Sequence, residues 1–184
     1  MSTVAEKLLT IEEYAAMPDT GPPTELVRGR IVEMSLPSFR HGIVCVQIAF
    51  LIMKYLEVPK IGRVVSNDSG IVTHRDPDSL RGADVAFYSY GRLPREIEVS
   101  GYPEVAPDLV FEVVSPTDRR GDILHKVAEY LDAGVTLVVV ADPKRNKIEN
   151  FRADGPVIAL DAEEEWSAPD ILPGFAVKVR SFFE

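Results

Sequence analysis

Two segments of the chain carry apolar residues at the spacing of a helix. Apolar side chains lie on nearly every side of the segment from Gly42 to about Glu57, which predicts a helix buried in the core. A second helix is predicted over 122–132, with Gly134 as its C-terminal stop. The residues expected on its apolar face are Ile123, Leu124, Val127, Tyr130 and Leu131.

Strand-like runs lie between and after these helices. Residues 63–73, 83–88 and 109–114 are β-prone, and residues 135–141 are continuously apolar, as in a strand covered on both faces. The order is therefore helix, strand, strand, strand, helix, strand. We predict an α/β fold in which a mixed sheet has a helix on each side.

Shorter elements are predicted on both flanks. Thr10-Ile11-Glu12-Glu13 has the capping-box pattern and opens a short helix, and residues 24–34 predict a hairpin that turns at Arg28-Gly29. The turn at 115–118 is expected to cap the helix that follows it. We expect one domain over 1–184, with a core of about 40–142, an N-terminal helix and hairpin in 1–39, and C-terminal strands in 143–184.

The net charge argues against a nucleic-acid partner, and the charge distribution weakens that argument. The net charge is -9, whereas phosphate binding usually needs an excess of Lys and Arg. Residues 24–60 nevertheless hold five bases and three acids. Acidic residues concentrate instead in 161–165, which we expect to be a solvated loop.

Several features suggest a cytoplasmic location. Cys45 is the single cysteine, so an internal disulfide is impossible, and we expect it to be a small buried hydrophobe. Residues 1–7 lack the basic segment and long apolar core of a secretory signal. The most apolar stretch, residues 43–53, is short for a membrane span and contains Gln47.

Two carboxylates interrupt apolar strands and are the first candidates for chemistry. Asp84 is expected to share its face with Ala86, and Glu112 to share its face with Asp108 and Val110, because alternate residues of a strand face the same way. A buried ionised carboxylate costs several kcal/mol, roughly, unless it is paired or binds a cation. A divalent cation between the two acids resolves this cost; separate pairing with arginines is the simpler alternative.

Lys126 is the third candidate. It lies at the edge of the apolar face of the second helix, so its stem can follow that face and bring the ammonium toward the sheet. A surface lysine is the commoner fate of such a position. His125 points away from the apolar face and is expected in solvent.

The chain resembles the PD-(D/E)XK nuclease superfamily and, more closely, the Uma-type restriction endonucleases within it. Each matching motif is weak alone, and the order and spacing of the motifs carry the resemblance. The matching motifs are Glu25-Leu26-Val27-Arg28-Gly29-Arg30-Ile31-Val32-Glu33-Met34, Arg40-His41-Gly42, Ala83-Asp84-Val85-Ala86-Phe87, Pro107-Asp108-Leu109-Val110-Phe111-Glu112-Val113-Val114-Ser115-Pro116, and Lys126 with Tyr130-Leu131-Asp132-Ala133-Gly134-Val135.

The resemblance implies a restriction-endonuclease-like fold and a metal-dependent nuclease. It implies that Asp84, Glu112 and the carbonyl of Val113 bind Mg²⁺, for which Mn²⁺ can substitute, and that the catalytic residues are Asp84, Glu112 and Lys126. The superfamily lysine usually stands two residues after the Glu, where this chain has Val114; Lys126 is expected to replace it. Supporting roles are expected for Glu25, His41 and Asp108. The implied partner is nucleic acid, most naturally DNA, cut by a homodimer.

Two other functions are compatible with the sequence. The fold could serve as a catalytically inactive module for binding or oligomerisation, which the acidic net charge favours. Alternatively, the two carboxylates could be the acid and base of a glycoside hydrolase. Such sites usually lie in aromatic-lined clefts, and the only tryptophan, Trp166, follows the acidic run.

Overall fold

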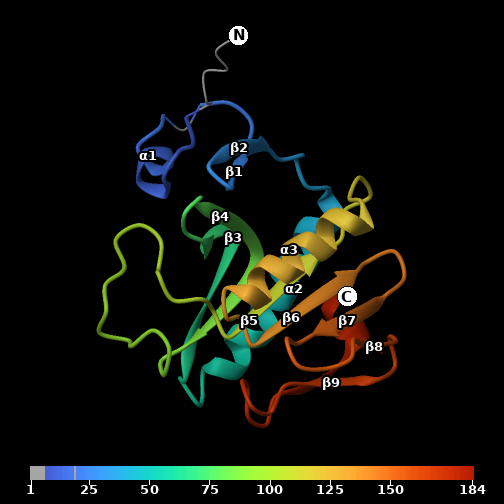
Figure 1. Ribbon diagram of the computed structural model, residues 1–184. Helices are drawn as coiled ribbons and strands as arrows, with labels where there is room; N and C mark the ends of the chain where they lie inside the picture. Colours follow the sequence, from blue (N-terminus) through green and yellow to red (C-terminus); the bar gives the residue numbers. More distant parts are fainter. Residues whose placement is uncertain (1–6, 19) are drawn as a thin grey trace.

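A computed structural model describes residues 7–18 and 20–184, and its centre is one mixed sheet (Figure 1). The segment considered above for a secretory signal lies, up to residue 6, outside the described residues. The helices are α1 (Ile11–Ala15), α2 (Phe39–Leu56) and α3 (Arg120–Asp132), and the 3-10 helix η1 (Val179–Phe182) follows near the C-terminus. The strands are β1 (Thr24–Val27), β2 (Arg30–Glu33), β3 (Gly62–His74), β4 (Ser79–Ser89), β5 (Leu109–Val113), β6 (Leu137–Asp142), β7 (Lys147–Phe151), β8 (Ile158–Leu160), β9 (Glu165–Ser167) and β10 (Ala176–Lys178).

The strand order brings distant segments together. The large sheet runs β2-β1-β4-β5-β6-β7-β8, and β3 pairs with β4 outside this path. Strands β5 and β6 are parallel and are joined through α3, whereas the other pairs in this sheet are antiparallel. The predicted α/β class and the order helix, strand, strand, strand, helix, strand are confirmed.

The two faces of the sheet bury separate apolar clusters. Helix α2 packs on one face through Val44, Ile48 and Ile52, and Trp166 is fully buried in the same cluster. Helix α3 covers the other face, and Figure 1 shows the two helices on opposite sides of the sheet. The helix predicted on each side is therefore confirmed. Leu124 is 38% exposed, because it lies at the margin of the α3 face that was predicted to bury it.

Helix α2 begins at Phe39, earlier than its apolar pattern indicates. The hydroxyl of Ser38 accepts a hydrogen bond from the N–H of His41 and caps the helix. At 18 residues, α2 is long and apolar enough by length and composition to cross a membrane. The argument from sequence against a membrane span considered only residues 43–53, which are part of this helix. One side of α2 packs on the sheet, whereas Val46, Phe50 and Met53 on its other side are exposed, so the helix is not buried on nearly every side as predicted.

Turn chemistry fixes the N-terminal elements as predicted. The capping box at Thr10 forms, and Arg28 and Gly29 have φ values of 48° and 74°, which suit the two-residue turn of the β1–β2 hairpin. One expectation was wrong: the turn at 115–118 does not cap α3. The N-cap residue is Arg119, and the carboxylate of Asp118 instead accepts a hydrogen bond from the N–H of Ser115 within the turn.

Candidate active site

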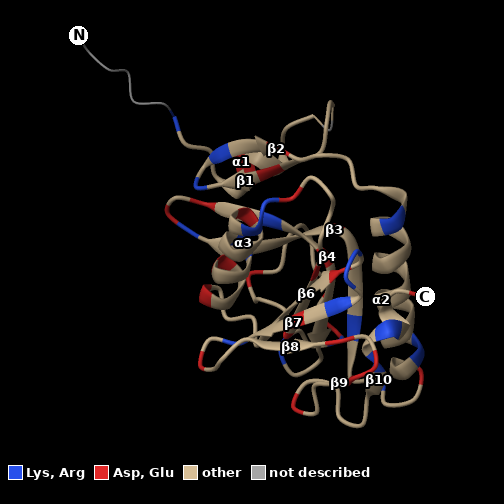
Figure 2. Cartoon of the chain, turned by 90° about the vertical axis from the view of Figure 1, so that its right-hand side faces the viewer, with Lys and Arg blue, Asp and Glu red and all other residues tan. Residues whose placement is uncertain are grey.

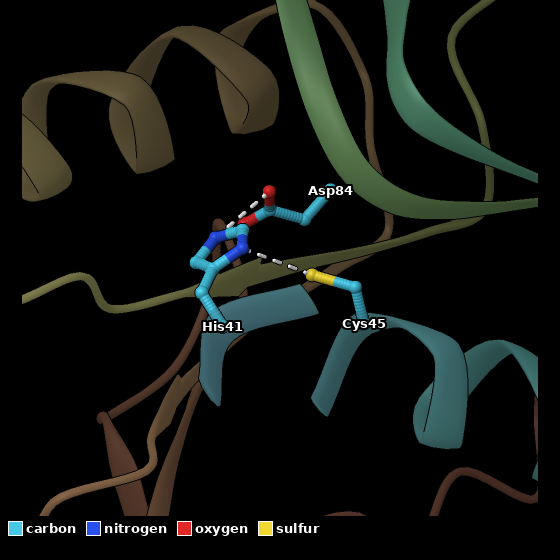
Figure 3. A group of neighbouring side chains, drawn as sticks. All are labelled: His41, Cys45 and Asp84. Carbon is cyan, nitrogen blue, oxygen red and sulfur yellow. Dashed lines mark hydrogen bonds and ion pairs between the residues drawn. The ribbon is translucent and has the colours of Figure 1, made fainter. Parts of the chain in front are cut away.

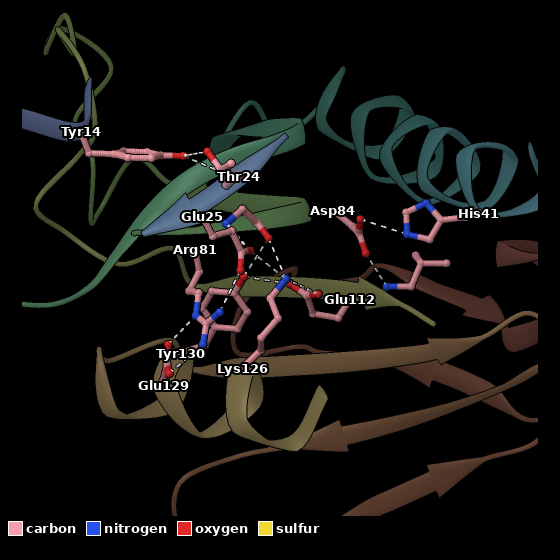
Figure 4. Close-up of polar contacts among 12 residues, drawn as sticks. Tyr14, Thr24, Glu25, His41, Arg81, Asp84, Glu112, Lys126, Glu129 and Tyr130 are labelled. Atoms are coloured by element: carbon pink, nitrogen blue, oxygen red, sulfur yellow. Dashed lines mark hydrogen bonds and ion pairs between the residues drawn. The ribbon is translucent and has the colours of Figure 1, made fainter. Parts of the chain in front are cut away.

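Strand pairing places the two predicted acids in neighbouring strands. In the antiparallel pair of β4 and β5, Val85 lies opposite Phe111, so the next step of the register sets Asp84 opposite Glu112. Both side chains are buried, with residue exposures of 8% for Asp84 and 9% for Glu112. The acids therefore meet at one end of these strands (Figure 4).

Lys126 reaches Glu112 from α3. Its ammonium lies 2.9 Å from Glu112 Oε2 and donates a hydrogen bond to the carbonyl of Gly82 at 3.0 Å. The hydroxyl of Tyr130, one turn further along α3, donates to Glu112 Oε1 at 2.8 Å. Both oxygens of the Glu112 carboxylate are thus held by side chains from one helix, which fixes its position.

Burial and charge act against each other at this ion pair. Burial raises the pKa of the Glu112 carboxyl to about 7, and the ammonium of Lys126 offsets only part of that rise. Burial alone would lower the pKa of Lys126, but the carboxylates of Glu112 and Glu25 outweigh it and keep its pKa above the ordinary value. Lys126 is therefore charged at neutral pH, whereas Glu112 can still take up a proton.

Glu25 of the hairpin completes this side of the site. One carboxylate oxygen accepts a hydrogen bond from the N–H of Gly82 at 2.9 Å and lies 3.3 Å from the Lys126 ammonium. The other oxygen accepts from Arg81 at 2.8 Å. Arg81 in turn makes a bidentate contact with Glu129 of α3, at 2.6 and 2.9 Å. Glu25 therefore connects the hairpin to β4 and α3, and its supporting role stays a prediction.

Asp84 makes a different set of contacts. Its Oδ2 accepts a hydrogen bond from the N–H of Val113 at 2.6 Å, and its Oδ1 lies 3.1 Å from His41 Nε2. The other ring nitrogen of His41 lies 3.4 Å from Cys45 Sγ (Figure 3). Burial would lower the pKa of His41, but the contact with Asp84 outweighs it and raises that pKa. Asp84 thus contacts the first turn of α2 and the backbone of β5, whereas Glu112 contacts α3, and both acids line the same cleft.

This contact differs from the simple alternation expected for β4. Ala83 and Ala86 both pack into the cluster under α3, although strict alternation places them on opposite faces. The pairing of β3 with β4 has an irregularity between Ser66 and Ser69, at the level of Asp84. A bulge re-aims nearby side chains, so Asp84 does not simply share the face of Ala86.

The acids and Lys126 open into one cleft of about 550 Å³, formed by the hairpin, the end of β4 and the start of α3. Among the cleft residues the acids are Glu25, Glu33, Asp68, Asp84, Glu112, Asp118 and Asp122, and the bases are Arg81, Arg119 and Lys126. Because acids outnumber bases in the cleft, a bound cation would stabilise the folded chain.

Two comparisons relate this chain to known proteins. The family model Uma2, described as "Putative restriction endonuclease", matches residues 11–180. The chain belongs to the Uma2 family. The crystal structure of a "putative nuclease belonging to DUF820" from Anabaena variabilis is similar in fold, with a TM-score of 0.83 and 19% sequence identity over 95% of this chain and 97% of that one. The comparison with curated proteins finds no match.

The donor atoms of this Uma2 protein suit a hard divalent cation. Asp84 and Glu112 provide carboxylate oxygens, the ligands that such ions prefer. The N–H of Val114 bonds to β6, whereas the N–H of Val113 points to Asp84. Because the N–H and C=O of a strand residue point the same way, the Val113 carbonyl also faces Asp84. These three donors are of the chemical type that such an ion takes.

The structure places some of the remaining predicted residues in the site and others outside it. His41 joins the site through Asp84, and His125 is exposed, as expected. Asp108 does not join it. Its carboxylate accepts a hydrogen bond from the N–H of Ser89 and pairs with Arg92, so the supporting role expected from the shared face is wrong. Asp108 precedes Glu112 by four residues in the chain, which is roughly 13 Å along an extended strand at about 3.3 Å per residue.

Three residues of this site were not predicted from the sequence: Tyr130, Arg81 and Asp68. Tyr130 was assigned only to the apolar face of α3. Arg81 lies in a stretch that was not assigned to a strand. Asp68 lines the cleft from the irregular part of β3, with φ of 52°, and burial followed by the charge of Asp84 raises its pKa. The polar run Ser66-Asn67-Asp68-Ser69, between the apolar pairs at 64–65 and 71–72, was the signal for such a bulge.

Proposed function

We propose that this protein is a metal-dependent endonuclease of the PD-(D/E)XK type that hydrolyses phosphodiester bonds, with DNA as substrate. Membership of the Uma2 family supports the nuclease assignment. The observation that carries the proposal is the contact between Lys126 and Glu112 in a cleft that also contains Asp84.

Each side chain has a role in this proposal. Asp84, Glu112 and the Val113 carbonyl would hold Mg²⁺, which supplies polarisation of the scissile phosphate and a lowered pKa for a bound water. Lys126 orients the attacking water or stabilises the negative charge that develops on the phosphate. Tyr130 and Glu25 keep Glu112 and Lys126 in place, because each makes a hydrogen bond or close ion pair with one of them.

Part of the acidic net charge lies away from the cleft, and a bound cation would offset the acids within the cleft. The acidic run at 161–165 lies between β8 and β9, and Figures 1 and 2 show these strands at the opposite end of the molecule from the β1–β2 hairpin that borders the cleft. Its charges therefore do not add to those of the acids that line the cleft, and salt screens exposed charges over roughly 8–10 Å. A homodimer and a cytoplasmic location are also proposed, the former from the resemblance and the latter from the sequence.

A cleavage panel tests the proposal. Supercoiled plasmid, linear duplex DNA, single-stranded DNA and RNA are incubated with the full chain in Mg²⁺, in Mn²⁺ and in EDTA. We expect cleavage of DNA that needs a divalent ion and that is lost in Asp84→Asn. The matched control is Asp154→Asn, which removes an exposed carboxylate from the turn after β7.

Two results would overturn the proposal. Cleavage that persists equally in Asp84→Asn places the activity at another site or in a contaminant. Absence of cleavage on every substrate, with nucleic acid still bound, assigns the fold to the non-catalytic binding module instead.

A further inference from the structure

We propose that His41, Cys45 and Asp84 form a second metal site, which takes a transition ion of the Zn²⁺ or Co²⁺ type and competes with the hard cation for Asp84. Binding of the ion is independent of the nuclease activity proposed above. Its consequence, inhibition of cleavage, rests on that activity.

The geometry of α2 brings the two softer ligands together. His41 and Cys45 are four residues apart in the helix, so their side chains lie on one face, as do paired ligands in helical metal sites. Cys45 Sγ is 3.4 Å from His41 Nδ1, and one ligand atom from each of the three residues lies within 4.8 Å of the others. Figure 3 shows both side chains pointing from α2 toward Asp84 of β4.

The site is already enclosed. The exposed fractions of His41, Cys45 and Asp84 are 9%, 9% and 8%, so the ligands are held by the packing of α2 on the sheet. The three donors are therefore already close together, and little side-chain freedom is lost on binding. An ion takes one ring nitrogen of His41, so the contact at the other nitrogen must shift, because Cys45 lies at Nδ1 and Asp84 at Nε2. This arrangement differs from a chance cluster of acids on an exposed surface.

The donor types select the ion. Mg²⁺ prefers oxygen ligands alone, whereas imidazole nitrogen, thiolate sulfur and carboxylate oxygen together suit Zn²⁺ and Co²⁺. The Cys45 thiol loses its proton to solvent as the metal–sulfur bond forms, and no electron is transferred. Binding should therefore strengthen as the pH rises.

Asp84 belongs to both ligand sets, which makes the two sites mutually exclusive. On one side it faces His41, and on the other it accepts a hydrogen bond from Val113, beside Glu112. A transition ion held with His41 and Cys45 draws the carboxylate toward α2. The hard cation then loses one of its carboxylates, so Zn²⁺ should inhibit cleavage supported by Mg²⁺.

Cobalt spectroscopy on the full chain tests the binding step. We expect Co²⁺ to give a thiolate-to-cobalt charge-transfer band in the near ultraviolet, and Zn²⁺ to remove it. The chain has one cysteine, so the band can arise only from Cys45. The band should persist in Glu112→Gln, which alters only the hard site, and should vanish in Cys45→Ser.

Absence of the band in the wild type at saturating Co²⁺ overturns the proposal, and so does a band that survives in Cys45→Ser. If Cys45→Ser does not fold, the wild-type spectrum still decides the result.

Inhibition is measured separately. The Zn²⁺ concentration that halves the Mg²⁺-supported rate should be at least tenfold higher in Cys45→Ser than in the wild type, each relative to its own uninhibited rate. Equal inhibition of the two overturns competition at this site. If the protein shows the cobalt band but cleaves nothing, the metal site stands and the nuclease proposal fails. If it cleaves DNA without the band, the nuclease proposal stands and the metal site fails.

Discussion

Lys126 Nζ lies 2.9 Å from Glu112 Oε2, which joins the helix after β5 to the acid at the end of that strand. Val114, two residues after Glu112, packs in the same cluster as α3 and leaves the polar space to the helix-borne lysine. The amine thus reaches the predicted active site from a neighbouring element rather than from the strand itself.

Removal of the Lys126 amine should abolish most activity. In Lys126→Met we expect the cleavage rate to fall by about 100-fold or more, the usual effect of losing a group that stabilises developing charge. The measurement is the single-turnover rate on the best substrate of the panel. Asp154→Asn, in the exposed turn after β7 and outside the cleft, is the control and should cleave like the wild type. Equal rates for Lys126→Met and wild type would remove Lys126 from the mechanism.

Moving the amine to the strand should restore part of that loss. Val114 is on the same face as Glu112, so a lysine there can bring its ammonium toward the same carboxylate. We expect the double variant Val114→Lys, Lys126→Met to cleave about tenfold faster than Lys126→Met alone. This corresponds to an activation free energy that is lower by about 1.4 kcal/mol. A folded double variant that is no faster would show that the position of the amine on α3 is essential.

Metal affinity should follow the protonation of Glu112. Its pKa is raised to about 7 by burial, so below that pH the cation must displace a proton. Mn²⁺ affinity should therefore rise by about tenfold per pH unit up to about pH 7 and then level off. Without metal, the sign for stability is opposite: the contribution of Glu112 falls as the pH rises from its ordinary value of 4.5 to about 7. Isothermal titration calorimetry over about three pH units, from roughly pH 5.5 to 8.5, measures the affinity. A flat profile in the wild type would contradict the assignment.

Arg81 should contribute to stability far more than an exposed arginine does. Its side chain is 11% exposed and contacts both Glu25 and Glu129, so Arg81→Met leaves two carboxylates without their cation. We expect the free energy of unfolding to fall by about 3–5 kcal/mol. The control is Arg152→Met, which breaks the pair with Asp170 at 39% exposure and should cost less than about 1 kcal/mol. Urea denaturation measures both, and similar losses in the two variants would refute this role.

Local patterns were enough to predict most of the elements. Apolar periodicity predicted α2 and α3, the capping box predicted α1, and Arg28-Gly29 predicted the hairpin, because each depends on residues close together in the chain. The contact of Lys126 with Glu112 was also predicted, since a helix edge and a strand face set the directions of both side chains. The residue pattern and the family resemblance together therefore placed the amine correctly.

The sequence determined which chemical groups this protein has and, through local periodicity, which elements carry them. Only the tertiary structure decided which groups meet. Asp84 turns to His41 and Val113 at an irregular part of the sheet, Asp108 pairs with Arg92 at the far end of the strand, and Tyr130 reaches Glu112 across the cluster under α3. Strand register and helix placement follow from burying whole apolar faces, and no short stretch of sequence contains that information.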